Sequence, residues 1–180
     1  MWQGCKTLNS LVDVSSPMDP LRIPKRSMPV QLQLQGQPPR QLALYLSDVA
    51  PAERSPDPGR VERLSDLLEA GPAFLPAQDL ATGAPAFIHL ERLVCAWVPA
   101  LLEYDALLAS PGASVHGVQV VLSEGAPVRG SVRYVLPPGA ARLTDFLNAP
   151  QRFLPVHTAD EQVVLVNKRY VLEVNVLPTP

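Results

Sequence analysis

Apolar and polar residues alternate along several short stretches of the chain, and this is the pattern of half-buried β-strands. Residues 31–35 and 131–136 both alternate in this way. Residues 163–176 predict two further strands joined by a tight turn at Asn167 and Lys168, because asparagine tolerates the backbone angles that such turns need. The pattern therefore predicts a mainly β protein.

A phrase of fourteen residues occurs twice. Residues 63–76 (RLSDLLEAGPAFLP) and 142–155 (RLTDFLNAPQRFLP) are identical at eight positions with an offset of 79. Flanking identities follow at an offset of 89 upstream and 77 downstream, and the inserted residues fall in turns. Each phrase has apolar residues at the i, i+3, i+4 spacing of one helical turn. We therefore predict a duplicated unit of strand, short helix and three strands.

Asp66 and Asp145 hold the same place in the two phrases. Two carboxylates brought together by a duplication would be able to bind a metal or perform acid–base chemistry. A structural role is favoured, because each aspartate lies at the start of a helical turn, three residues after Arg63 or Arg142. Helix capping, by the aspartate or by the hydroxyl residue before it, together with an ion pair, then accounts for both.

Composition limits the class of protein. The 180 residues are 47% hydrophobic, which is enough for one good core or two small ones packed together. The 21 prolines lie between the apolar stretches and separate predicted strands. The net charge of -2 argues against a dedicated binder of nucleic acid or of anionic membranes, which would need a basic surface.

No cluster of catalytic or metal-binding residues is visible. Cys5 and Cys95 give neither a disulfide framework nor a metal-ligand spacing, and Cys95 lies in an apolar stretch typical of a buried strand. His89, His116 and His157 share no spacing with one another or with the cysteines. There is no nucleophile elbow and no phosphate-binding glycine loop. We therefore expect no cofactor, no metal, no catalytic residue and no enzymatic activity.

The same patterns suggest domain boundaries. We expect a disordered leader over 1–29, a first β unit over 30–99, a helical linker over 100–114, a second β unit over 115–176 and a tail over 177–180. No apolar stretch reaches the length of a membrane span, and the first residues lack the basic start and apolar core of a signal peptide. These features predict a cytoplasmic protein.

The second unit resembles a small bacterial β-barrel domain of uncharacterised function, in which RL[ST]DxLN is followed by FLP and then by VNK. Residues 126–176 carry these motifs, whereas the first unit departs at Glu69, where Asn148 stands in the second, and at Glu91, where Lys168 stands. The resemblance implies an all-β fold with short helices, made of two tandem Sm-like or SH3-like small barrels or half-barrels. No RNA-binding residue of Sm-like proteins can be assigned to this chain from the resemblance, because residues 166–170 (VNKRY) lack the glycine of the Sm-like RNA signature.

We expect a non-enzymatic adaptor or regulatory module that binds another protein, because the edges of small barrels suit peptide docking by strand addition. The expected interaction surface lies in the second unit, around Asn148, Arg152, Asn167 and Lys168. The alternative function is binding of single-stranded RNA, which the arginine–tyrosine pairs of the second unit favour only weakly. The sequence leaves open whether the chain forms homo-oligomers.

Overall fold

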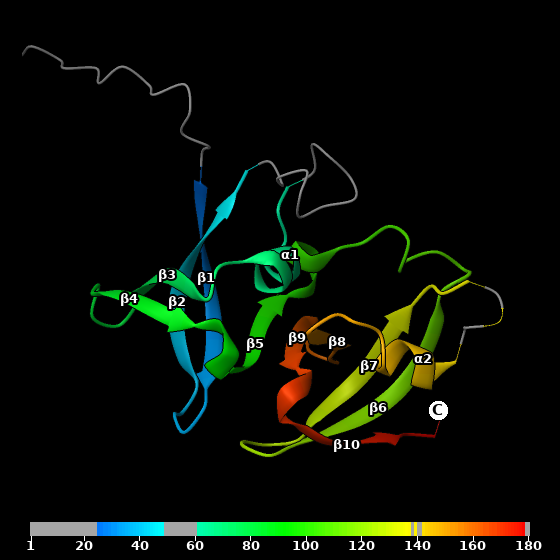
Figure 1. The fold of residues 1–180 in the computed structure, drawn as a ribbon. Helices are drawn as coiled ribbons and strands as arrows, with labels where there is room; N and C mark the ends of the chain where they lie inside the picture. The colour runs from blue at the N-terminus through cyan, green and yellow to red at the C-terminus, as the bar shows by residue number, and fades with distance from the viewer. Residues whose placement is uncertain (1–24, 49–60, 138, 140–141, 179–180) are drawn as a thin grey trace, which may run out of the picture.

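The structure is a computed structural model that describes residues 25–48, 61–137, 139 and 142–178 (Figure 1). The first half contains β1 (Lys25–Leu34), β2 (Arg40–Ser47), α1 (Leu64–Ala70), β3 (Phe74–Asp79), β4 (Pro85–His89), the 3₁₀ helix η1 (Leu90–Arg92) and β5 (Leu93–Pro99). The 3₁₀ helix η2 (Ala100–Glu103) follows. The second half contains β6 (Ser114–Leu122), β7 (Val128–Tyr134), α2 (Leu143–Leu147), β8 (Phe153–His157), β9 (Gln162–Asn167), the 3₁₀ helix η3 (Lys168–Tyr170) and β10 (Val171–Val176). The predicted mainly β fold is confirmed.

All ten described strands belong to one antiparallel sheet, in the order β10-β6-β7-β8-β9-β5-β1-β2-β3-β4. Each half contributes five neighbouring strands, and the two sets have the same internal order, since β10-β6-β7-β8-β9 corresponds to β5-β1-β2-β3-β4. The halves meet where β5 pairs with β9. Among the described residues no strand pairing closes either set into a barrel, so the sheet is open at both ends.

Corresponding residues can be identified from the strand pairings. The pairs Leu32–Arg40 and Val120–Val128 differ by 88 residues at both positions. For the third and fourth strands the offsets are 79 and 78, as in Phe74–His89 and Phe153–Asn167. The fifth strand also has an offset of 78, and β5 and β10 each have a bulge at the same place in their pairing with the first strand. The flanking offsets predicted from sequence, 89 and 77, were each wrong by one residue.

The two repeated phrases form α1 and α2, as predicted. The helices begin two or three residues earlier than expected, because Arg63 and Arg142 occupy the N-cap positions. Asp66 and Asp145 instead stand at the third helical position, where each carboxylate accepts a hydrogen bond from the backbone N–H of the arginine, at 3.0 and 3.2 Å. The aspartates thus complete a capping box rather than serving as the N-caps themselves.

Two predicted boundaries and one predicted turn need correction. Strand β1 begins at Lys25, so residues 25–29 belong to the sheet and not to a disordered leader. The predicted linker helix is a single 3₁₀ turn, η2, followed by turns. The tight turn expected at Asn167 and Lys168 is the 3₁₀ helix η3, with Asn167 as its N-cap. The remainder of the predicted leader, residues 1–24, lies outside the described residues, as does most of the insertion in the first half, residues 49–60.

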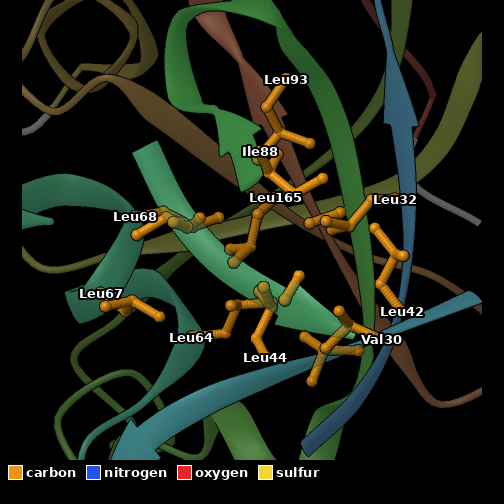
Figure 2. Close-up of a cluster of buried hydrophobic side chains, with 14 of the residues drawn as sticks. Val30, Leu32, Leu42, Leu44, Leu64, Leu67, Leu68, Ile88, Leu93 and Leu165 are labelled. Carbon is orange, nitrogen blue, oxygen red and sulfur yellow. The ribbon is translucent and has the colours of Figure 1, made fainter. Parts of the chain in front are cut away.

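The buried side chains form two cores, and each core contains residues from both halves. The first core is built on β1, β2, α1 and β5, and three residues of the second half enter it, namely Phe153, Val163 and Leu165. Figure 2 shows Leu165 among the leucines of the first half. In return, Val94 and Cys95 of β5 enter the second core. The halves are therefore joined by shared apolar packing as well as by strand pairing. None of the described helices has the length and apolar character needed to cross a membrane.

Candidate functional site

A groove with a volume of about 490 Å³ lies between the two halves. One wall comes from α1, η2 and the residues after η2. The opposite wall comes from β7, α2 and the start of η3, and β8 and β9 contribute apolar side chains. Grooves of this size between packed units are common ligand sites. This groove combines a wall of acidic groups, a wall with basic groups and aromatic rings.

The acidic wall is held together by Arg63. Its guanidinium forms ion pairs with Asp105 at 2.8 Å and with Asp66 at 3.3 Å. The Arg63 contact helps to hold the pKa of Asp105 below its ordinary value, although burial acts in the opposite direction. Glu103 accepts a hydrogen bond from the backbone N–H of Ser65 and is only 7% exposed. Burial raises the pKa of Glu103, because a charged carboxylate is poorly solvated there.

A further acidic residue of α1, Glu69, connects the two halves. Its two carboxylate oxygens accept hydrogen bonds from the backbone N–H groups of Arg152 and Phe153, at 2.8 and 2.7 Å. These contacts fix the start of β8 against the end of α1. The carboxylate of Glu69 is therefore already occupied by backbone donors of the second half.

The opposite wall carries positive charges that have no carboxylate partner among the described residues. Arg133 is exposed and forms none of the observed ion pairs. Lys168 forms no ion pair within the described chain and donates from Nζ to the carbonyl oxygen of Ala149 at 2.7 Å; burial lowers its pKa, and the charge of Glu69 across the groove offsets only part of this effect. Burial and the charge of Arg133 lower the pKa of His157, which therefore favours the neutral form. This wall is able to receive an acidic group.

Aromatic side chains line the same groove. The ring of Tyr134 stacks on Phe146 with centroids 4.6 Å apart, and on His116 at 5.8 Å. Tyr134 is 2% exposed, and its hydroxyl has no hydrogen-bond partner among the described residues. A buried hydroxyl without a partner is costly and is often satisfied by a ligand or by water. Phe146 and Phe153 add apolar surface beside it.

The four residues predicted as an interaction surface lie in one region but do not share one role. Asn148 and Arg152 are exposed, at the end of α2 and just before β8. Lys168 lines the groove. Asn167 is 1% exposed, so its assignment to an interaction surface is corrected. Its Nδ2 donates to the carbonyl oxygen of Leu93 at 2.8 Å, and its side-chain oxygen accepts from the backbone N–H of Arg169 at 3.0 Å.

The structure does not bring the two repeated aspartates together in the groove. Asp66 lines the groove, whereas Asp145 does not. In the part of the chain that the structure describes, no group of three or more His, Cys, Asp or Glu side chains is placed to hold a metal ion. Cys95 is fully buried, as predicted, and burial raises the pKa of its thiol to about 12.

Sequence reasoning missed Glu103, and it noted Arg133 and Tyr134 only as a weak sign of RNA binding. Glu103 and Arg133 are single charges in different segments, and Tyr134 has the pattern of an ordinary core residue, so no local spacing marks the three as a group. Only the packing of η2 and β7 on the two sides of the β5–β9 interface brings them to one groove. Comparison of the chain with protein-family models, with curated proteins and with solved structures found no match.

Proposed function

We propose that the protein is a non-enzymatic interaction module that binds an acidic segment of another protein in the groove between its halves. The observation that carries this proposal is the arrangement of charges in the groove. Asp66 and Asp105 are paired with Arg63, Glu69 is bonded to backbone N–H groups, and Glu103 is buried and accepts from the N–H of Ser65. Within the described chain, Arg133 and Lys168 of the opposite wall form no ion pair.

The chemistry of the partner follows from the facing surfaces. An aspartate or glutamate of the partner would meet Arg133 and Lys168, and such charge-assisted contacts give specificity and fast association. An apolar side chain next to it would cover the half-buried ring of Phe146, since aromatic surfaces in a concave site are typical anchor positions. A polar group of the partner would satisfy the hydroxyl of Tyr134.

We further propose that the two halves are copies of one unit, each with the plan of an Sm-like or SH3-like half-barrel. The common strand order, the capping boxes of α1 and α2 and the bulges in β5 and β10 support a duplication. A duplication explains why the interaction groove lies between the halves, because the β5–β9 pairing places α1 of one copy beside β8 of the other.

A capture experiment with matched variants tests the binding proposal. The double variant Arg133→Glu, Lys168→Glu reverses the two positive charges on the wall formed by β7, α2 and η3. Arg129→Glu makes the same change four residues away on β7, where the side chain is exposed, bonds to Gln119 and does not line the groove.

We expect the wild type and Arg129→Glu to capture the same protein from a lysate, and the double variant to lose it. Calorimetry with the purified partner should then show direct binding that the double variant weakens at least tenfold. Equal binding by both variants would refute the groove as the site. Capture of nucleic acid that salt displaces steeply would support the alternative of RNA binding instead.

A further inference from the structure

The sheet ends in two strands whose outer edges are unpaired. Within the described chain, β4 pairs only with β3, and β10 pairs only with β6. An open edge presents a row of backbone donors and acceptors that a further strand can pair with. In the common strand order of the two halves, β4 corresponds to β9 and β10 corresponds to β5. The two free edge strands are therefore the counterparts of the two strands, β9 and β5, that pair with each other inside the chain.

The internal pairing of β5 with β9 therefore shows how β10 of one chain would pair with β4 of another. On the β9 side, three side chains cross into the core of the other half, namely Phe153, Val163 and Leu165, and each is at most 3% exposed. With the offsets of 79 and 78, the corresponding residues of the first half are Phe74, Pro85 and Phe87. Phe74 is 55% exposed and Phe87 is 73% exposed. The first half thus exposes an apolar group where the second half buries one.

The opposite edge has the same property. On the β5 side, Val94 crosses into the core of the second half and is fully buried. Its counterpart on β10 is Leu172, which is 69% exposed. Val174 of β10 packs partly against the second core, as the corresponding Ala96 packs against the first. Each edge therefore has the apolar surface that the other edge would cover.

Polar groups at the two edges correspond as well. At the internal interface Glu69 accepts hydrogen bonds from the backbone N–H groups at the start of β8, and its counterpart on α2 is the exposed Asn148. The amide oxygen of Asn148 is able to accept the equivalent bonds from the start of β3. Asn167 donates across the internal interface to Leu93, and its counterpart is His89, whose Nδ1 has no hydrogen-bond partner among the described residues.

We propose that the chain assembles head to tail, with β10 of one copy pairing in antiparallel fashion with β4 of the next. The internal register, in which Ala96 faces Leu165 and Val98 faces Val163, fixes the register between chains. Val174 then lies opposite Phe87, Asn175 opposite Ala86, and Val176 opposite Pro85.

This interface uses different patches on the two molecules, so each added copy leaves one free edge of each kind. Such a contact produces a ring where the rotation closes and a filament where it does not. Glu173 stands where Cys95 stands internally, and Pro85 lacks a backbone N–H, so the interface between chains is weaker than the internal one and reversible. It lies on different strands from the groove and does not depend on the proposed partner.

Two edge variants and a control test the proposal. Phe87→Lys blocks β4 and Leu172→Lys blocks β10, and both side chains are exposed in the single chain, so folding is preserved. Leu101→Lys makes the same type of change at a residue that is 84% exposed and lies on neither edge. Sedimentation velocity over a range of concentrations reports the size of each species.

We expect the wild type and Leu101→Lys to form species of two or more chains, and each edge variant alone to stay monomeric. An equal mixture of the edge variants should form a one-to-one dimer and nothing larger, because the first retains β10 and the second retains β4. A monomeric wild type at all concentrations, a mixture that stays monomeric, or an edge variant that dimerises alone would overturn the proposal. The groove variants described above should assemble like the wild type, so failure of one proposal is distinguishable from failure of the other.

A disulfide test examines the register in a Cys5→Ser background. Cysteines at facing positions of antiparallel strands are close enough for a disulfide, whereas a shift of one residue points them to opposite faces. A mixture of the single variants Ala86→Cys and Asn175→Cys should therefore form a disulfide between chains. A mixture of the single variants Ala86→Cys and Val174→Cys should not. Equal cross-linking of both mixtures would contradict the proposed register.

Discussion

Replacement of Asn167 by alanine is a sharp test of how the two halves are held together. The side chain is 1% exposed and makes two hydrogen bonds, one to the carbonyl oxygen of Leu93 in β5 and one from the backbone N–H of Arg169 in η3. Loss of the N-cap contact costs about 1 kcal/mol. A buried carbonyl left without its donor costs about 1–3 kcal/mol. We therefore expect Asn167→Ala to lower the free energy of unfolding by about 2–4 kcal/mol.

Urea unfolding followed by circular dichroism measures this loss as a lower midpoint with an unchanged slope. Asn167→Asp is a useful second variant, because it keeps an acceptor for the N–H of Arg169 but has no donor for Leu93. We expect it to be destabilised by more than the lost Leu93 contact, because it also buries a carboxylate beside a carbonyl oxygen. Asn148→Ala removes an exposed asparagine and should change stability by no more than about 0.5 kcal/mol. A loss below about 1 kcal/mol for Asn167→Ala would show that its two hydrogen bonds do not hold the halves together.

Three further predictions concern buried positions. A Cβ at Gly130 would lie 2.2 Å from the carbonyl oxygen of His157, so Gly130→Ala should destabilise the protein by about 1–3 kcal/mol, while Gly112→Ala, in open space, should have little effect in the same urea assay. In a Cys5→Ser background the thiol of Cys95, with its pKa raised to about 12 by burial, should react with a thiol reagent at pH 8 only after unfolding, and rapid reaction of the native protein would refute its burial. Because burial raises the folded-state pKa of Glu103, wild-type stability is lost as pH rises from the ordinary glutamate range. The gain in melting temperature for Glu103→Gln should thus be larger at pH 7 than at pH 4, and an equal gain at both pH values would contradict this.

The sequence predicted the two short helices and four strands for each half, because these depend on local periodicity, but it placed one strand before each helix where the structure has two. Its alternation of apolar and polar residues placed strands at 31–35 and 131–136, which fall in or across β1 and β7. The repeated phrases at 63–76 and 142–155 correctly contained α1 and α2. Local propensity was less informative at the ends of elements, where β1 extends to Lys25 because β2 provides pairing partners from Lys25 to Leu32.

The one-residue errors in the flanking offsets have a physical cause. An offset of 89 aligns Gly36 with Gly125, and both glycines have positive φ angles. The first hairpin is centred on residue 36, as the pair Leu32–Arg40 requires, but the second is centred on residue 124. Because side chains in a strand alternate between faces, a shift of one residue exchanges buried and exposed positions. The burial pattern, with Leu32 and Val120 both fully buried, decides the correspondence.

The candidate groove was out of reach for sequence reasoning for a different reason. Its walls come from segments that belong to different halves, so it depends on how β5 and β9 pair. Lys168 was found because it stands in a distinctive motif, whereas Asn167, in the same motif, proved to be structural. The presence of a polar residue in a motif therefore does not show whether it contacts a partner or the rest of the fold. Only the exposure of its side chain in the structure separates the two cases.

The contrast between the internal interface and the free edges bears on assembly. A sheet edge that must remain single is usually protected by charge, by proline or by a covering segment. Glu173 and Pro85 offer some protection here. The edges nevertheless expose three large apolar side chains to solvent, which lowers solubility, namely Phe74, Phe87 and Leu172. Their counterparts at the internal interface are all buried. If the free edges had no partner, replacement of Phe87 and Leu172 by lysine should raise solubility without changing the oligomeric state, whereas head-to-tail pairing requires that both properties change together.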